Sequence, residues 1–500
     1  MPLSATARFK RRLRALTARV TRNRLTFVFF LFGFFHCFAQ GIVQSFQFTL
    51  DQQYASFFDS IIKTAGVNSR AHADLRDRGD QFQLRVCYDI PHSLPSAKCS
   101  AVFDINKDSN QTEGADSNSK LRGTLVQKMM LDQNASVLPD TSGVILQIPT
   151  QDPDQPHNVT LSNTCVQTLL LPWQRIQNAR REDVTFVILQ FWLFGISMMA
   201  MTRDSVPHIL AGLGTRIILT AWSAYALWRS PKYHDDFRKL IEHPGTPCSL
   251  EIFTEYFKTR THYEIVDAVL NCTALLIAAY LSSALLKRYN VESFNYIGAP
   301  PKIVRIHRYF MAVQVCLQLE AFVLLAWIGL WTDQVFSTFI KDITWTQALF
   351  KGSAITWSIL LAPWIVTGWY GIRNEHRLAT LIFIVFAFVH LACSSVMFYS
   401  EVYRWTFVNW PNFGCYVTAS LVLLTASFVL GILCRMNFGQ GLSQYLRAEE
   451  ALASSDFAPE VFEHDVEKVD LDLTLSDPES KPEANGHSAQ TFNIPTLPWK

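Results

Sequence analysis

Residues 184–201 read VTFVILQFWLFGISMMAM, an uncharged apolar run that as a helix spans about 30 Å of hydrocarbon. Because the core of a bilayer offers no water to unpaired backbone groups, such a run is expected to be helical. Comparable runs recur up to Arg435, separated by polar breaks. The full set is 184–201, 208–228, 264–286, 310–331, 348–371, 378–400 and 413–434. The sequence therefore predicts a seven-helix transmembrane bundle over residues 183–435.

The composition agrees with a membrane protein. Hydrophobic residues make up 49% of the chain and charged residues only 17%, yet residues 47–182 and 436–500 are long polar stretches. The apolar residues are thus concentrated in the predicted bundle. A formal net charge of +2 gives no bulk attraction to nucleic acid, so the lipid bilayer, and not nucleic acid, is the expected partner.

A further apolar segment, rich in phenylalanine, occupies residues 25–46. It follows a basic segment, residues 1–24, that contains no acidic residue. Because basic residues beside a span stay on the cytoplasmic side, the amino terminus is predicted to be cytoplasmic. Two interpretations remain open. The segment is either a retained signal anchor, which gives eight spans, or a signal peptide cleaved after Ala39, which gives seven.

Residues 47–182 form the largest polar block outside the predicted spans. Its sequons at Asn110, Asn134 and Asn158 indicate a glycosylated lumenal or extracellular domain. Residues 81–90 alternate between apolar and polar side chains, as a half-buried strand does. Residues 101–105, 143–149 and 164–171 are further predicted strands, 52–65 a helix and 106–122 a solvated loop. We therefore expect a small, mainly β domain.

Alternation of the spans then places the carboxyl terminus in the cytoplasm. Most predicted cytoplasmic loops are rich in Lys and Arg, as expected. Residues 229–263 disagree, because this loop falls on the lumenal side and is also basic.

The same topology exposes Cys87, Cys99, Cys165 and Cys248 to the oxidising side, which permits two disulfides in three pairings. One bridge is predicted to join the lumenal domain to the loop that contains Cys248. The alternative is one bridge and two free thiols.

Ionisable side chains within spans are costly to bury and often functional. Arg216, Glu320 and His390 are predicted to lie about 12 to 18 Å from the cytoplasmic ends of their helices, near mid-bilayer. One hypothesis makes Arg216 and Glu320 a buried ion pair on a ligand or proton path, with His390 beside it. The other makes the same pair a fixed packing contact. No enzyme signature is present, and neither a metal, a cofactor nor a catalytic residue is predicted.

The tail, residues 436–500, turns acidic and is predicted to be mostly disordered in the cytoplasm, where it would engage a cytosolic partner. Four short segments in and beside the bundle, 222–228, 270–276, 318–325 and 438–445, resemble an uncharacterised family of multi-pass membrane proteins of basidiomycete fungi. That resemblance implies a fungal protein of the secretory pathway and brings no assigned activity or site.

Two classes of function follow. The first is a receptor or a trafficking and sorting protein, whose lumenal domain binds an unknown ligand. The second is a transporter or channel that uses Arg216, Glu320 and His390. The sizes of the lumenal domain and the tail favour the first, in the plasma membrane or a secretory-pathway membrane.

Overall fold

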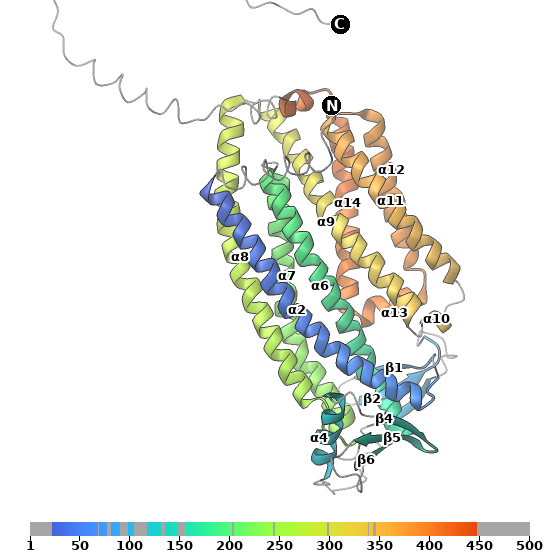
Figure 1. Cartoon of the computed structure of the whole chain (residues 1–500). Coiled ribbons are helices and arrows are strands. Elements are labelled where there is room, and N and C mark those ends of the chain that lie inside the picture. Colours follow the sequence, from blue (N-terminus) through green and yellow to red (C-terminus); the bar gives the residue numbers. More distant parts are fainter. Residues whose placement is uncertain are drawn as a thin grey trace, which may run out of the picture. The chain divides into compact units, whose positions relative to one another are not determined.

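The computed structural model describes residues 23–447 except 69, 78–81, 91–98, 105–117, 132–135, 149–156, 203–204, 244–245, 298–299, 339 and 344–346. Long helices lie side by side, and two small sheets cover one end of them (Figure 1). The predicted basic segment and nearly all of the acidic tail lie outside the described residues, as do Asn110 and Asn134.

The long helices form two groups that meet at α9. The first group contains α2 (Arg24–Thr64), α6 (Leu170–Thr202), α7 (Val206–Phe237) and α8 (Thr254–Ile297). The second contains α9 (Pro301–Ser337), α11 (Gln347–Arg373), α12 (Arg377–Met397) and α14 (Pro411–Met436). Helix α9 contacts both α6 and α7 and so joins the groups. Shorter elements lie between consecutive helices within each group. They are a π-helical turn η1 (Arg238–Glu242) after α7, α10 (Ile340–Ile343) after α9 and α13 (Glu401–Asn409) after α12.

Within the described residues, eight helical segments are long and apolar enough to cross a membrane. Each predicted hydrophobic run lies in one of them, including residues 25–46 in α2, except that the ends 348–349 and 398–400 fall just outside their segments. This confirms the helical, multi-pass class of fold. Their outer surfaces suit lipid, because large apolar side chains such as Phe35, Ile188 and Leu276 are more than half exposed there.

Helix α2 is much longer than the predicted anchor. Its 41 residues span about 60 Å, twice the thickness of a bilayer core. The predicted helix 52–65 is therefore the far end of this single helix. The helix ends at Thr64, two residues before Gly66, whose φ is positive at 67°.

The β region consists of two antiparallel sheets of three strands each, ordered β1-β2-β3 and β4-β5-β6. The strands are β1 (His72–Asp77), β2 (Phe82–Cys87), β3 (Cys99–Asp104), β4 (Ser136–Asp140), β5 (Gly143–Ile148) and β6 (His157–Ser162). The strands predicted at 81–90, 101–105 and 143–149 are confirmed. Helix α4 (Asn118–Leu131) includes residues 118–122 of the predicted loop, where the prediction was wrong.

The strand predicted at 164–171 is also wrong. Residues 163–168 form the short helix α5 (Asn163–Thr168), and α6 begins at Leu170. The side chain of Ser162 caps α5 by accepting a hydrogen bond from the backbone N–H of Cys165 at 3.2 Å. A capped helix thus begins at Asn163, in place of the predicted strand.

The β region is tied firmly to the helices. Its buried core, which includes Leu84, Val144 and Leu161, is continuous with Phe58 of α2 and Phe253 just before α8. Disulfides join Cys87 to Cys99 and Cys165 to Cys248. The second bridge links the β region to the segment between α7 and α8, as predicted.

Candidate functional site

The predicted intramembrane residues do not come together. A guanidinium nitrogen of Arg216 on α7 lies 3.2 Å from Nδ1 of His36 on α2. Glu320 on α9 instead accepts a hydrogen bond from Ser420 on α14 at 2.5 Å. The predicted ion pair between Arg216 and Glu320 is therefore wrong, both as a path and as a packing contact. His390 on α12 is buried with its ring 5.8 Å from that of Trp364.

The structure places a different set of polar residues inside the first helix group. Five buried side chains follow one face of α2, which we call the polar column. They are His36, Gln40, Gln44, Gln47 and Asp51. Their spacing of three or four residues keeps them on one side of a helix. The opposite side exposes apolar residues such as Phe38 and Phe46. This helix thus has its polar face inside the bundle, the reverse of a surface helix of a soluble protein.

In the middle of the polar column, a buried carboxylate is surrounded by neutral donors. Asp267 of α8 accepts hydrogen bonds from Ser223 at 2.7 Å, from Asn271 at 3.0 Å, and from the side-chain amides of Gln40 and Gln44. Several donors to one carboxylate offset part of the cost of its burial. The sequon at residues 271–273 is correspondingly unusable, since Asn271 is buried among these groups.

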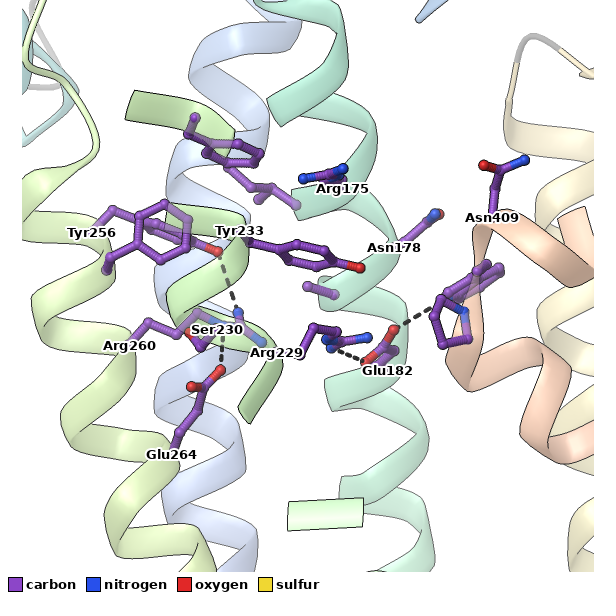
Figure 2. Close-up of a pocket in the computed structure, with 16 residues that line it drawn as sticks. Arg175, Asn178, Glu182, Arg229, Ser230, Tyr233, Tyr256, Arg260, Glu264 and Asn409 are labelled. Atoms are coloured by element: carbon purple, nitrogen blue, oxygen red, sulfur yellow. Dashed lines mark hydrogen bonds and ion pairs between the residues drawn. The ribbon is translucent and has the colours of Figure 1, made fainter. Parts of the chain in front are cut away.

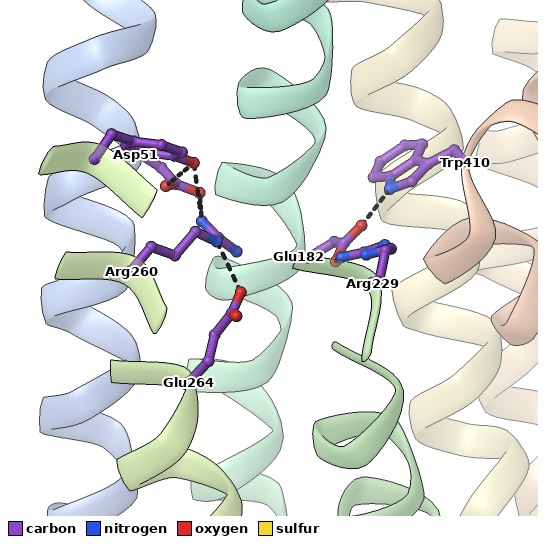
Figure 3. Close-up of polar contacts among 7 residues, drawn as sticks. Asp51, Glu182, Arg229, Arg260, Glu264 and Trp410 are labelled. Atoms are coloured by element: carbon purple, nitrogen blue, oxygen red, sulfur yellow. Dashed lines mark hydrogen bonds and ion pairs between the residues drawn. The ribbon is translucent and has the colours of Figure 1, made fainter. Parts of the chain in front are cut away.

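Nearer the β region lies a layer of buried charges, which we call the ionic layer. Its members are Asp51, Glu182, Asp183, Arg229, Arg260 and Glu264. Figure 3 shows its two halves. In one, Arg260 contacts Asp51 and also donates to Glu264 at 3.0 Å. In the other, Glu182 accepts from Arg229 at 3.2 Å and from the indole of Trp410 at 2.9 Å.

These contacts explain the basic loop that disagreed with the predicted topology. Residues 229–237 and 254–263 belong to helices α7 and α8, and not to a loop. Arg229 and Arg260 are buried against carboxylates. The exposed side chains of Lys239 and Lys258 pair with Asp235 and Glu255, which lie three or four residues before them in the chain. Four of the positive charges counted in this segment are therefore compensated, Lys239 and Lys258 by acids of the segment itself and Arg229 and Arg260 by carboxylates outside it.

Two small cavities flank the ionic layer. The inner cavity, of about 30 Å³, is lined by Gln44, Gln47, Ser223, Asp267 and all members of the ionic layer except Asp51. The outer cavity, of about 40 Å³, lies toward Tyr233 and Asn409 (Figure 2). Both are lined by Glu182, Arg229, Arg260 and Glu264. Each has room for about two or three water molecules.

The outer cavity adjoins a much larger one, which we call the junction cavity. Its volume is about 380 Å³, within the range of small-molecule sites. Its walls come from β1, from the far end of α2, from the first turns of α6 and from the end of α9. They include Ala73, Leu75, Trp173, Gln177, Arg180, Arg181, Gln334 and Trp405. A ligand here would touch the β region and the helices at once.

The charges of the junction cavity are uneven. Four cations line it, Lys63, Arg175, Arg180 and Arg181. Three of them pair with Asp59, Asp236 and Asp333, whereas Arg180 donates to the neutral amide of Gln52 at 2.7 Å. Four cations against three carboxylates leave one positive charge in excess.

Other parts of the cavity wall are aromatic. Trp405 of the junction cavity packs edge to face against His72, with ring centroids 5.4 Å apart. Burial lowers the pKa of His72 to about 4, so this ring is neutral at physiological pH and adds no charge to the wall. Trp173 and Tyr233 also line the cavity. Indole and phenol rings beside a guanidinium suit a ligand that has both an apolar part and an anionic group.

The ionic layer was not predicted from the sequence, for an identifiable reason. The predicted site residues were charged residues deep in the apolar runs, whereas the ionic layer lies at the ends of those runs. The spacing of the polar column from His36 to Asp51 was readable in the sequence.

No family model, curated protein or solved structure matches the chain. In the described part of the chain, no three His, Cys, Asp or Glu side chains form a metal centre.

Proposed function

We propose that this chain is a receptor-like or sorting protein of the membrane that binds a small anionic ligand in the junction cavity. The observation that carries the proposal is the composition of the cavity wall. Residues from β1, α2, α6 and α9 surround one space, and Arg180 supplies its excess positive charge. A ligand bound there links the β region to the helix group, which is the coupling that a receptor needs.

The expected ligand is a small molecule with one anionic group and an apolar face. A carboxylate or phosphate would accept charge-assisted hydrogen bonds from Arg180, and the apolar part would lie against Trp173 or Trp405. Because the excess is a single charge, polyanions are disfavoured. The acidic tail remains the proposed contact for a cytosolic partner.

The first prediction tests this ligand class. Purified protein is heated with aromatic carboxylates, aliphatic carboxylates and phosphate monoesters, each paired with its neutral amide or alcohol. We expect an anion to raise the melting temperature and its neutral analogue not to do so. Arg180→Gln should weaken binding of the stabilising anion about tenfold or more, the value of one charge-assisted hydrogen bond.

Arg76→Gln is the matched control, because Arg76 lies on β1 with a side chain 46% exposed and does not line the cavity. It should leave the affinity unchanged. Equal stabilisation by the neutral analogues, or equal loss of affinity in both variants, would contradict an anion site at Arg180.

We further propose that the β region is lumenal or extracellular and that the protein belongs to the secretory pathway. Asn158, on β6, is exposed and heads the sequon Asn158-Val159-Thr160. Expressed in a eukaryotic cell, the wild type should therefore carry a glycan there. Asn158→Gln should abolish one glycosidase-sensitive step in gel mobility, while Thr160→Ser, which keeps the sequon, should retain it. If the glycosidase-sensitive shift in gel mobility is the same in Asn158→Gln as in the wild type, this support for a lumenal β region is lost.

A second candidate function is transport. The polar column and the inner cavity favour it, because they extend the polar interior from the ionic layer toward His36 and Arg216. In this alternative the column, and not the set of Arg216, Glu320 and His390, would line the path. Uptake of the stabilising anion into proteoliposomes would distinguish it from a receptor.

A further inference from the structure

Two carboxyl groups meet between α2 and α6, inside the ionic layer. Asp51 is fully buried and accepts hydrogen bonds from Tyr256 at 2.9 Å and from Arg260. Asp183 is 3% exposed and lies beside Asp51, within hydrogen-bonding reach of its carboxyl group. Among the described residues, no donor reaches Oδ2 of Asp183. Two carboxylates in contact can form a hydrogen bond with each other only if one of them carries a proton.

The charges around the pair leave it without sufficient compensation. Glu182 is paired with Arg229, and Arg260 is shared by Asp51 and Glu264. The layer therefore holds four carboxylates and two guanidinium groups, and Asp183 is the carboxylate without a cation of its own. An uncompensated charge in a buried site is strongly unfavourable, and like charges in contact add repulsion.

We propose that Asp51 and Asp183 together bind one exchangeable proton between α2 and α6. The neutral member donates to the charged one, which Arg260 holds. Asp183 also lines the inner cavity, whose water-sized space gives the proton a route to and from the pair. When the proton leaves, repulsion between the two carboxylates pushes apart two helices that pack along each other. The pair is thus a proton-binding site that biases the packing of the bundle.

A proton fits this site better than a metal ion. The described residues bring no three potential metal ligands of the His, Cys, Asp and Glu types together. The titratable and charged groups around the pair come from three helices. Tyr256 and Arg260 of α8 contact Asp51, Glu264 of α8 contacts Arg260, and Glu182, next to Asp183 on α6, contacts Arg229 of α7. Apart from the two guanidinium groups, none of them brings a positive charge. The inference concerns helix packing and does not depend on which ligand occupies the junction cavity.

The test compares the wild type with Asp183→Asn, which mimics a carboxyl group that cannot release its proton. The wild type should lose several degrees of melting temperature between about pH 7 and about pH 9, because only its folded state still holds the proton. The variant should lose markedly less, and its infrared spectrum should lack one band of a protonated carboxylic acid. If Asp183→Asn fails to accumulate, Asp183→Ser is measured in the same way.

Two results would overturn the proposal. One is an equal pH dependence in the wild type and the neutral variant, with no carboxylic-acid band lost. The other is a melting temperature that rises with Na⁺ against choline at constant pH and ionic strength in the wild type but not in the variant. That result would assign the site to a metal cation.

Discussion

Replacing Arg260 with leucine should destabilise the folded protein by about 3 to 5 kcal/mol, the cost of breaking a buried ion pair. The guanidinium group contacts Asp51, donates to Glu264 at 3.0 Å and lies 3.3 Å from the hydroxyl of Tyr256. Leucine would leave the fully buried carboxylate of Asp51 without its cation. Unfolding in detergent, followed by heating or by titration with a denaturant, measures the loss.

Lys258→Leu is the matched control on the same helix. The side chain of Lys258 is 63% exposed and pairs with Glu255 at 3.7 Å, so its removal should change the stability by less than about 0.5 kcal/mol. Adding Asp51→Asn to Arg260→Leu should recover part of the loss, because it removes the stranded charge. A loss in Arg260→Leu no larger than that in Lys258→Leu would show that the ionic layer contributes nothing to folding.

Removing the disulfide between Cys165 and Cys248 should have the second large effect. The bridge joins residues 83 positions apart, and it fastens the β region to the segment before α8. Loop-closure entropy assigns such a bridge up to about 4.5 kcal/mol of stabilisation. The double variant Cys165→Ala, Cys248→Ala should therefore unfold at a clearly lower temperature than the wild type.

The bridge between Cys87 and Cys99 is an internal comparison, because it closes only 12 positions. The same relation gives it at most about 3 kcal/mol, so its removal should cost less. The difference between the two double variants is the decisive quantity. If loss of the short bridge cost as much as loss of the long one, the long bridge would not be what holds the β region to the helices.

The sequence predicted the helices well because membrane-length apolar runs leave few alternatives to a helix. It also predicted that Cys248 pairs with a cysteine of the β region, since the lumenal side offered it no other partner. The choice of Cys165 needed the structure. The error at 164–171 arose because this short segment, which ends in the apolar residues 169–171, fits a strand or a buried helix equally well.

The arrangement of polar residues was harder to predict, for a geometric reason. Sequence position gives the depth of a side chain along a helix, and Arg216 and Glu320 are both deep. It does not give the neighbouring helix that each one faces. Arg216 faces α2 and Glu320 faces α14, so similar depth led to a wrong pair. The polar column on α2 does indicate direction, because residues spaced three or four apart lie on one face of a helix and meet the same neighbouring helices. Depth along a helix does not indicate this.

The most direct test of the proposed anion site does not require the natural ligand. Leu75→Cys on β1 and Gln177→Cys on α6 place a thiol in the junction cavity from its two sides. The exposed free cysteines Cys272, Cys393 and Cys415 are first replaced by alanine. The measurement is the rate at which each thiol reacts with an anionic and with a cationic methanethiosulfonate of similar size.

We predict that the anionic reagent reacts faster at both positions, by about tenfold at low salt, and that Arg180→Gln removes most of this preference. Ser142→Cys, in the exposed turn between β4 and β5, should show no such dependence on Arg180. Faster reaction with the cationic reagent, or a preference that survives Arg180→Gln, would contradict an anion-binding cavity between the β region and the helices.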